Sequence, residues 1–561
     1  MRSIDSLTRV ASLLFALCAS AHATTYYVSA SGSDAAAGTS SGVAWKTLQH
    51  AANVVQAGDT VIVLPGTYAG FNLFTSGAPG APITFTANSG GSTPNSNVVV
   101  NTNNTFTGKD RINLEGASHV VIEGFTVLGT GDPATNRTGI RTVLASHVTI
   151  RANRADLCGR WGILTGFVDD VVIEDNECSR SAAEHGIYVS NSGDRPIVRR
   201  NLIWGNHSNG LHMNGDVTLG GDGVISDALV ERNVIYENGN GNPAFGAPGG
   251  SAINCDGVQN ATIRNNLLYL NHKSGISLYR IDGGAPSSGN RVVNNTVRNA
   301  SDARWALNIQ DASSGNVVVN NVLLNDHSFR GAVDIGSSCL PGMIANHNAV
   351  KDTFSIDGSV MTLAQWKATT GLDAASFVSS VGALFVNPSA GDYQLKSGAP
   401  AIDKGQSAFA PSDDLLGKHR PAGLGFDIGS YEFGACFGTT ASIGTGIAGQ
   451  GGLAPKLGAS GCPDAGASFA LNVSQGAQNA AGVLFVGTQA ASIPAFGGTL
   501  YLVPTVQVAH ALDASGAWSV ATTIPSIAGL AGQIARVQGF YADAAAAAGV
   551  SATAAIEITF G

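Results

Sequence analysis

The feature that most constrains the fold of this chain is a repeat in which an apolar residue is followed three positions later by asparagine. The asparagines recur every 23 to 33 residues, at Asn153, Asn176, Asn201, Asn233, Asn266, Asn295, Asn321 and Asn348. Phe125 takes the asparagine place in an earlier copy. Self-similarity with a period of about 20–50 residues is typical of solenoids, in which a single copy cannot bury its apolar face alone.

A second short apolar run follows each asparagine after about ten residues. These runs begin at Gly162, Gly186, Gly210, Ala252, Gly275, Ala306 and Ala332. They alternate apolar with polar residues, which is the period of a half-buried strand. We therefore expect coils of short strands, stacked about 4.8 Å apart around one continuous apolar core. Each asparagine then lies at a turn and bonds its counterparts above and below, which is a structural and not a catalytic role.

Further motifs occur at the start of the chain. They are Tyr26-Tyr27-Val28-Ser29, Trp45-Lys46-Thr47-Leu48, Ala57-Gly58-Asp59-Thr60-Val61, Pro65-Gly66-Thr67-Tyr68 and Ala81-Pro82-Ile83-Thr84-Phe85. Together with the repeat, they resemble secreted right-handed parallel β-helix proteins of the pectate-lyase-like polysaccharide lyase group. The resemblance implies an all-β chain with a right-handed parallel β-helix over residues 24–435, capped by a helix at Leu48–Val55. It leaves the chemistry open, because this fold hosts lyases, hydrolases, epimerases and adhesins.

The C-terminal part of the chain has a different composition. The asparagine pattern stops near Asp352, a short helix is expected over Thr362–Gly371, and a closing segment ends at residue 435. Residues 436–561 are rich in Ala and Gly and predict a small β-sandwich, similar to accessory domains of exported bacterial proteins. Its expected strands are Ser468–Val473, Ala481–Val486, Thr499–Val508, Ala517–Thr522, Ala535–Tyr541 and Ala554–Phe560.

The first 23 residues predict a secretory signal peptide. Two arginines precede an apolar run, and Ala21-His22-Ala23 is a small-x-small cleavage motif. We therefore expect a secreted or cell-surface protein. Six cysteines remain beyond this segment, and two pairs are candidates for disulfides: Cys436 with Cys462, and Cys158 with Cys178, which lie one repeat apart.

The charge balance restricts the partners. The formal net charge is −9 and only 12% of residues are charged, against about 25% in an ordinary soluble domain. Without clusters of Lys and Arg, nucleic-acid binding is not expected. No later run reaches the length of a transmembrane helix. We expect a monomer that acts on an acidic polysaccharide.

Alignment of the second strands predicts an outward-facing column along the solenoid. Its expected substrate-binding residues are Tyr188, Asn214, Asn254 and Asn308, with His212 between them. The two longest repeats insert loops beside this column, at about residues 215–223 and 239–250. Long loops beside a regular stack are where binding sites usually form.

The residues near these loops suit β-elimination of a uronate-containing glycan. Lys273 is the candidate base, Arg280 would neutralise the substrate carboxylate, and Tyr279 and His212 are alternative proton carriers. Calcium is a possible cofactor, because several oxygen ligands are at hand. Its candidate ligands are Asp216, Asp256 and Asp282. Asp216 and Asp282 each lie beside a glycine, so a turn role is the alternative interpretation.

Two other functions fit the same sequence. A glycoside hydrolase needs paired carboxylates, which Asp256 with Asp282 or Asp216 would supply. A surface or matrix protein would bind glycans along the side of the solenoid without cleaving them. A uronate epimerase is disfavoured, because the sequence has no Asp-Pro-His motif.

Overall fold

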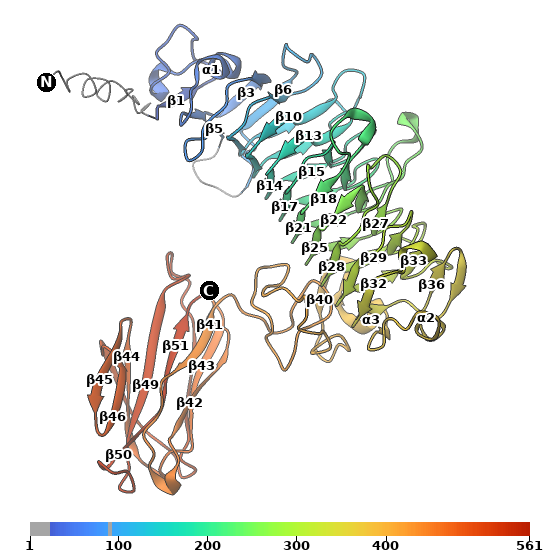
Figure 1. Ribbon diagram of the computed structural model, residues 1–561. Coiled ribbons are helices and arrows are strands. Elements are labelled where there is room, and N and C mark those ends of the chain that lie inside the picture. Colours follow the sequence, from blue (N-terminus) through green and yellow to red (C-terminus); the bar gives the residue numbers. More distant parts are fainter. Residues whose placement is uncertain (1–22, 88–92) are drawn as a thin grey trace, which may run out of the picture. The chain divides into compact units, whose positions relative to one another are not determined.

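The computed structural model describes residues 23–87 and 93–561, and the predicted signal peptide lies almost entirely outside the described residues. Residues up to Val378 form one compact unit and residues from Ser379 form a second. The first unit is a right-handed parallel β-helix built from three long sheets (Figure 1). Each full coil contributes one strand to each sheet, so the predicted solenoid is confirmed.

The first sheet contains the strand that precedes each repeat asparagine. In spatial order its strands are β1 (Thr25–Val28), β2 (Thr60–Val63), β5 (Ile83–Thr86), β8 (Val120–Glu123), β11 (Val148–Arg151), β14 (Val172–Glu174), β17 (Ile197–Arg199), β21 (Leu229–Glu231), β25 (Thr262–Arg264), β28 (Arg291–Val293), β31 (Val317–Val319) and β34 (Ile344–Asn346).

The second sheet contains the strand that follows each asparagine. Its strands are β3 (Gly66–Ala69), β6 (Val98–Thr102), β9 (Thr126–Leu128), β12 (Arg154–Asp156), β15 (Glu177–Ser179), β18 (Leu202–Trp204), β22 (Val234–Tyr236), β26 (Leu267–Tyr269), β29 (Thr296–Asn299), β32 (Val322–Asn325), β35 (Ala349–Val350) and β38 (Phe377–Val378).

The third sheet contains the alternating runs that the sequence predicts as second strands. It comprises β4 (Phe71–Leu73), β7 (Ile112–Glu115), β10 (Thr138–Ser146), β13 (Trp161–Asp169), β16 (Ile187–Ser190), β19 (Leu211–Asn214), β23 (Ile253–Asp256), β27 (Ile276–Tyr279), β30 (Leu307–Ile309), β33 (Val333–Ile335), β36 (Phe354–Ile356) and the antiparallel β37 (Ser359–Met361). A further pair, β20 (Ile225–Ser226) with β24 (Val258–Gln259), lies in the longer coils.

The repeat asparagines form a continuous internal ladder at the turn between the first and second sheets. The backbone N–H and the side-chain amide of Asn201 both donate to Asn233 Oδ1, at 2.9 and 3.0 Å. The same amide also donates to the carbonyl of Ile173, at 2.9 Å. The pattern runs from Phe125, whose N–H donates to Asn153, to Asn348, which donates to Ser376 and Asp373.

The residue before each ladder asparagine adopts a left-handed backbone conformation, with φ near +55°. These residues are Ala152, Asp175, Arg200, Arg232, Asn265, Asn294, Asn320 and His347, with Gly124 before Phe125. This conformation costs a non-glycine residue about 1–2 kcal/mol, so the turn is held by the hydrogen bonds that the asparagine makes. A second ladder, which the sequence pattern did not reveal, joins Asn206, Asn238 and Asn271 at the turn into the third sheet.

The apolar core runs through the whole stack. The inward residues of the third sheet, such as Ile187, Leu211 and Ile253, are fully buried. The N-terminal end is closed by α1 (Leu48–Val54), which begins after the N-cap Thr47 and buries Leu48, Ala51 and Ala52. Near the other end, α2 (Leu363–Thr370) begins with a capping box between Thr362 and Gln365 and buries Trp366. Both predicted helices are confirmed, and they cover core that an open end would expose.

The second unit holds the antiparallel sheets. It begins with α3 (Val381–Leu384), β39 (Phe385–Asn387) and β40 (Asp392–Leu395). Its six-stranded sheet comprises β41 (Thr439–Ile443), β44 (Ala481–Gly487), β47 (Val506–Ala511), β49 (Ile534–Ala542), β50 (Val550–Ala552) and β51 (Ala555–Thr559). A three-stranded sheet comprises β42 (Lys456–Gly461), β43 (Ser468–Ser474) and β48 (Trp518–Thr523), and β45 (Ala490–Ala495) pairs with β46 (Gly498–Leu502).

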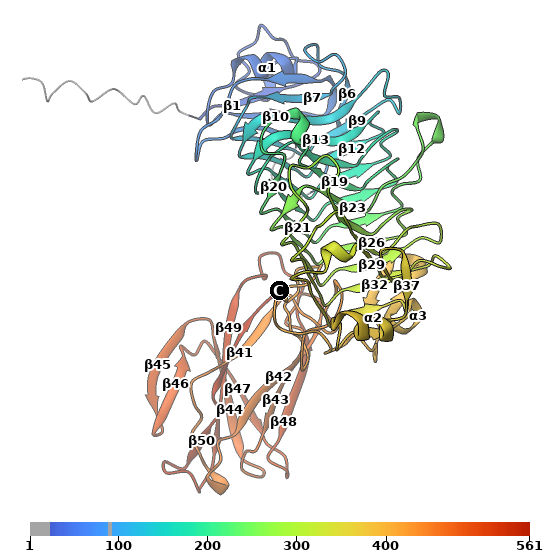
Figure 2. The same cartoon turned by 45° about the vertical axis from the view of Figure 1, so that its right-hand side comes forward.

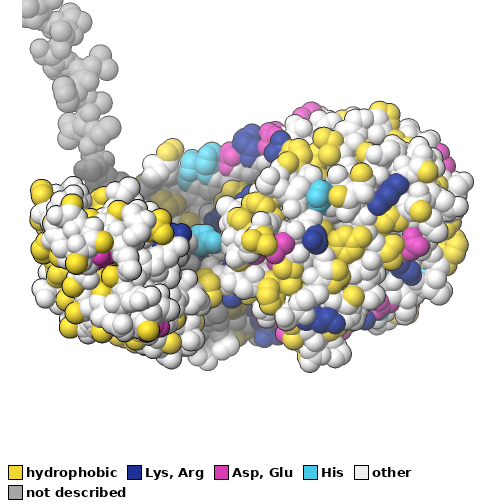
Figure 3. Space-filling model, turned by 90° about the horizontal axis from the view of Figure 1, so that it is seen from below, with side chains coloured by type: hydrophobic (Ala, Val, Ile, Leu, Met, Phe, Trp, Pro, Cys, Tyr) yellow, Lys and Arg dark blue, Asp and Glu magenta, His cyan; other side chains and the backbone are white. Residues whose placement is uncertain are grey.

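Residues from both sheets share one core, among them Phe469, Leu484 and Ile556, so the antiparallel part is a sandwich. The predicted single run Thr499–Val508 is two strands, β46 and β47. The strands of the sandwich begin at Thr439, close to the expected boundary at 435/436, whereas the compact units divide after Val378. Charged side chains are sparse on the face drawn in Figure 3, in keeping with the composition.

The cysteines divide into one disulfide and four buried thiols. Cys436 and Cys462 are bonded, as one of the two candidate pairs predicts. The Cys158–Cys178 pair is wrong, because both residues are free and fully buried. They fill core positions on the inner side of successive coils, where each behaves as a small hydrophobic residue.

Replacing Asn201 by Leu should lower the free energy of unfolding by about 1–3 kcal/mol, because the amides and N–H groups of the neighbouring coils lose their partners. Denaturant unfolding followed by circular dichroism measures this loss. Asn240→Leu is the matched control, because Asn240 is exposed and lies outside both ladders. Equal stability of the two variants would contradict a supporting role for the ladder.

Candidate functional site

One column of side chains runs along the outer face of the third sheet, one residue per coil. Strand register aligns Tyr188 with His212, His212 with Asn254, Asn254 with Ser277 and Ser277 with Asn308. The column continues to Leu164 and Arg141 on one side and to Asp334 on the other. The sequence alignment of the strands is therefore confirmed, and we call this surface the binding face (β13, β19 and β23 in Figure 2).

A pocket of about 600 Å³ lies on the binding face beside β23, β27 and β30. We call it the basic pocket. Its polar and charged lining includes Asn209, Ser251, Asn254, Lys273, Ser277, Tyr279, Arg304, Asn308, Gln310 and Asp311. Residues 247–250 of a long inserted loop form one wall, as the repeat lengths predict.

Two cations of the basic pocket have no anionic partner. Lys273 and Arg304 occupy equivalent places in adjacent coils, and the Arg304 N–H donates to the Lys273 carbonyl at 2.8 Å. Among the described residues, neither the Lys273 ammonium nor the Arg304 guanidinium has a hydrogen-bond or ion-pair partner. Most arginines elsewhere on the β-helix are paired, for example Arg195 with Asp170 at 2.7 Å. With two cations and one carboxylate, Asp311, among its lining residues, the basic pocket has an excess of positive charge.

Tyr279 lies on the same wall with its hydroxyl held in place. The Asn254 side-chain amide donates to the Tyr279 oxygen at 2.7 Å. The phenolic proton is therefore left to donate to a bound molecule. Burial raises the pKa of Tyr279, and the nearby charge of Asp256 adds to this effect. Tyr279 is consequently protonated at neutral pH.

Arg280 lies outside the lining of the basic pocket. Its side chain is exposed, and its Nε donates to the Gly283 carbonyl at 3.2 Å. Arg304, one coil further along, is the arginine that lines the basic pocket. The signal for Arg304 was its position three residues before an inward-facing strand residue, which is the position that Lys273 holds in the preceding coil.

Of the three candidate calcium ligands, Asp256 ends β23, whereas Asp216 and Asp282 lie in the loops that follow β19 and β27. The buried Asp256 carboxylate accepts from the backbone N–H groups of Ile281, Asp282 and Gly283, at 2.9, 2.9 and 3.0 Å. Asp216 accepts from Thr218 N at the start of a short 3-10 helix. The Asp282 carbonyl accepts from Val217 N, at 3.0 Å, which joins the two loops. The Asp216 contact matches its turn interpretation. Asp256, for which no turn role was predicted, instead holds the backbone of residues 281–283.

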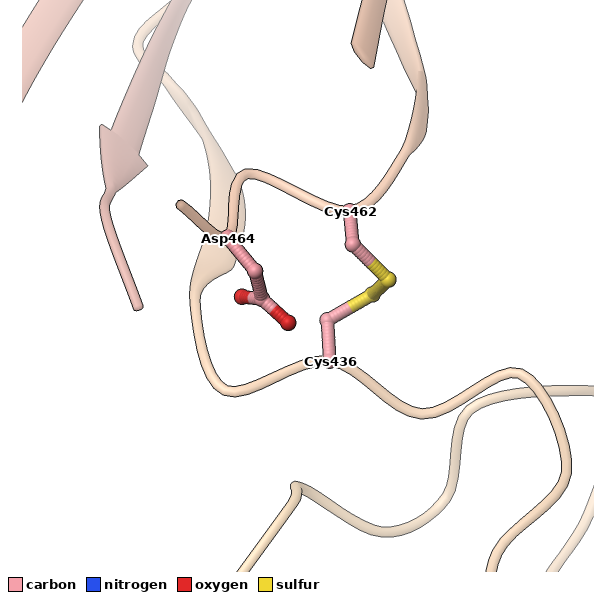
Figure 4. A group of neighbouring side chains, drawn as sticks. All are labelled: Cys436, Cys462 and Asp464. Carbon is pink, nitrogen blue, oxygen red and sulfur yellow. A yellow bond between two sulfur atoms is a disulfide. The ribbon is translucent and has the colours of Figure 1, made fainter. Parts of the chain in front are cut away.

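The three carboxylates do not form a compact ligand set. In residues 23–87 and 93–561, the one group of three potential ligand atoms within 4.8 Å of one another is Cys436, Cys462 and Asp464 (Figure 4). Its sulfur atoms are joined in the disulfide, and Asp464 accepts the N–H groups of Phe437 and Gly438. Disulfide sulfurs are not thiolate ligands, so this group is structural. Calcium binding stays a prediction without support from this geometry.

His212 is held as a neutral hydrogen-bond donor. The Asn209 N–H donates to His185 Nδ1 at 3.2 Å, so the His185 proton is on Nε2. That nitrogen lies 3.0 Å from His212 Nδ1, which leaves the His212 proton on Nε2. Burial lowers the pKa of His212 to about 3 and also lowers that of His185. This arrangement suits positioning better than proton transfer.

A second pocket, of about 370 Å³, lies further along the binding face beside β10, β13 and β16. We call it the aromatic pocket, because Trp161, Phe167 and Tyr188 line it together with Leu164 and Leu219. Tyr188 stacks between Trp161 and His212, with ring centroids at 5.9 and 5.0 Å. Its hydroxyl accepts from the Asn214 amide at 3.2 Å.

The structure therefore brings the predicted residues into two neighbouring groups. Lys273, Tyr279, Asn254 and Asn308 share the basic pocket, and Tyr188 lines the aromatic pocket with His212 and Asn214 between the two. Arg304, Ser251 and Trp161 line the two pockets although the sequence pattern did not predict them as site residues. Ser251 lies in an irregular segment and reaches the pocket through its contact with Ser277 at 2.8 Å, which no sequence spacing reveals.

Comparison with known proteins supports the fold. A family model described as a right handed beta helix region matches residues 83–221. The crystal structure of pectate lyase Pel9A superposes with a TM-score of 0.52 at 15% identity, covering 73% of this chain and 96% of that chain. A rhamnogalacturonan lyase also matches, with a TM-score of 0.44 at 17% identity, covering 58% of this chain and 87% of that chain. At these identities the likeness shows the fold, and the chemistry has to be argued from this chain.

An alginate lyase from Paenibacillus sp. str. FPU-7 matches with a TM-score of 0.39 at 20% identity, covering 51% of this chain and 95% of that chain. No curated protein sequence matches this one. Within the part of the chain that the structure describes, no helix combines the length and the apolar character needed to cross a membrane.

The buried histidine should make stability depend on pH. The pKa of His212 in the folded protein lies below the unfolded value of about 6.5. The contribution of His212 to the free energy of unfolding is therefore complete above pH 6.5 and is lost as the pH falls towards 3. Between pH 7 and pH 4 the free energy of unfolding of the wild type should fall by on the order of 2–3 kcal/mol more than that of His212→Gln. Urea titrations across this range measure the difference. His147→Gln is the control, because His147 is exposed, and its stability should depend on pH as that of the wild type does. If stability depends on pH equally in all three proteins, His212 is not the group responsible.

Proposed function

We propose that this protein is an exported polysaccharide lyase that cleaves a uronate-containing glycan by β-elimination in the basic pocket. The observation that carries the proposal is the pair of unpartnered cations, Lys273 and Arg304, beside a tyrosine whose proton is free to donate. A pocket on the outer face of a solenoid is open along the stack, as a polymer substrate requires. The disulfide Cys436–Cys462 agrees with an oxidising, extracellular compartment.

The first chemical requirement is to make the C5 proton of the uronate acidic. A guanidinium beside the substrate carboxylate stabilises the negative charge that develops when this proton leaves. Arg304 is available for this task, because its charge is not neutralised by any described carboxylate. Arg280, the residue that the sequence favours, is exposed and outside the pocket lining.

The second requirement is a base and an acid on the pocket walls. Lys273 acts as the base after its ammonium has released a proton to solvent. The free amine takes the C5 proton, the electrons of the C5–H bond form the C4–C5 double bond, and the C4–O bond breaks. The leaving glycosidic oxygen then takes the proton of Tyr279. Asn254 supports this step by donating to the phenol oxygen, which directs the phenolic proton away from itself and towards the pocket.

The alternatives have weaker support. A hydrolase needs two carboxylates, and Asp311 is the one carboxylate among the described residues that line the basic pocket. Asp256, the expected partner, is occupied by three backbone donors. A binding protein without activity would use the same pockets, so only an assay separates it from a lyase.

Lys273→Ala and Arg304→Ala should each lower the turnover rate by about 100-fold or more, the usual cost of losing a base or a charge stabiliser. Pectate, alginate and glycosaminoglycans are the substrates to screen, with the ultraviolet absorbance of the new double bond as the readout. Arg280→Ala tests the sequence-based assignment and should have the smaller effect.

Arg151→Ala is the matched control, because Arg151 pairs with Glu123 on the first sheet. Near-normal turnover of both pocket variants would contradict the assignment. New reducing ends without a double bond would indicate a hydrolase, and binding without cleavage a glycan-binding protein. A parallel screen with EDTA tests the calcium prediction separately.

A further inference from the structure

The two pockets on the binding face differ in charge. The basic pocket has two unpaired cations, whereas both arginines of the aromatic pocket are neutralised. Arg137 bonds the buried Asp110 through Nε and Nη2, and Arg141 bonds Glu115 and Asn113. An anionic sugar would therefore gain little charge compensation in the aromatic pocket.

The aromatic pocket instead offers apolar surface and unsatisfied hydrogen-bonding groups. Trp161, Leu164 and Phe167 supply the apolar surface, and the exposed Leu219 reaches over it from the inserted loop. Among the described residues, Trp161 Nε1 and Asn191 Oδ1 have no hydrogen-bond partner, although both residues line this pocket. Buried polar atoms without partners are rare, and one donor and one acceptor suit the hydroxyl groups of a sugar.

The loop that covers this pocket is fastened in place. Ser192 Oγ accepts from the Gly223 N–H at 2.8 Å, and Val217 N donates to the Asp282 carbonyl at 3.0 Å. The first contact holds the loop against the aromatic pocket, and the second joins it to the loop beside the basic pocket. The two pockets are therefore bordered by loops that are hydrogen-bonded to each other.

The spacing of the pockets fits a single glycan chain. From Leu164 in the aromatic pocket to Ser277 in the basic pocket the register runs through Tyr188, His212 and Asn254, which is four strand steps. At about 4.8 Å per step this is about 19 Å, the length of a short oligosaccharide. One chain laid along the binding face reaches both pockets.

We propose that the aromatic pocket binds a neutral sugar residue, so that the substrate is a heteroglycan in which neutral sugars accompany uronates. The neutral ring would place its C–H face on the aromatic side chains and its hydroxyls on Trp161 Nε1 and Asn191. The uronate part of this inference rests on the proposed function, and the neutral-sugar part does not.

Isothermal titration calorimetry with the full chain tests the proposal. The probes are three oligosaccharides of equal length: an oligogalacturonate, an alternating galacturonate–rhamnose oligomer and a neutral galactose oligomer. Tyr279→Phe serves as the background, because loss of the proposed acid should slow turnover while the other residues that line both pockets are unchanged. The alternating oligomer should bind about 10-fold more tightly than the oligogalacturonate, which is about 1.4 kcal/mol.

In this background, Trp161→Ala should weaken the alternating and neutral oligomers by about 10-fold and change the oligogalacturonate less than about twofold. Trp204→Ala is the control, because Trp204 lies on the second sheet and lines neither of these pockets. Leu219→Ser is a second test in case the tryptophan variant misfolds, because Leu219 is exposed and its replacement leaves the core intact. It should weaken binding of the alternating and neutral oligomers by a smaller factor.

Equal binding of the three oligomers, or equal weakening of all three by Trp161→Ala, would overturn the proposal. The proposal would also fail if neither Trp161→Ala nor Leu219→Ser changed the affinity for the neutral oligomer. If elimination is found without a preference for neutral sugars, this inference fails and the lyase assignment stands. If the neutral oligomer binds at Trp161 but no polymer is cleaved, the aromatic pocket stands and the lyase assignment fails.

Discussion

The parallel pairing of each coil with the next is the interaction on which the rest of the structure depends. It sets the spacing of about 4.8 Å between equivalent residues, and the two asparagine ladders hold the turns that make this pairing possible. The ladder amides are buried, and each satisfies groups in the coils on both sides. Losing one asparagine therefore leaves unpaired groups in two neighbouring coils, and this explains why the residue recurs while the loops around it change in length.

The same regularity creates the binding face. Because the parallel strands of the third sheet pair in a constant register, outward residues from separate coils form a column, and residues far apart in sequence become neighbours. Lys273 and Arg304 are an example, since they are 31 positions apart in the printed sequence and joined by a backbone hydrogen bond. The longer repeats add walls to this face without disturbing the core, because their extra residues leave the stack between strands.

Charge pairing separates the structural arginines from the candidate functional ones. Along much of the outer surface, an arginine on one coil faces a carboxylate on another, as Arg199 does with Glu174. Each such exposed pair contributes little to the stability of the fold, but together the pairs leave few charges on this surface without an opposite partner. Against this background, the two unpaired cations of the basic pocket and the neutralised pair in the aromatic pocket give the binding face two ends of different chemistry.

The sequence by itself determined the solenoid, the main asparagine ladder and the outward column, because each follows from a period that is local in the chain. The N-terminal capping helix followed from the family resemblance and not from a period. It could not reveal that Asp256 is held by the N–H groups of residues 281–283, that His185 fixes the tautomer of His212, or that Arg304 and not Arg280 lines the basic pocket. Loops of different length and side-chain direction decide those contacts. Only the tertiary structure determines which loop folds over which coil, since that choice depends on packing between residues that no repeat relates.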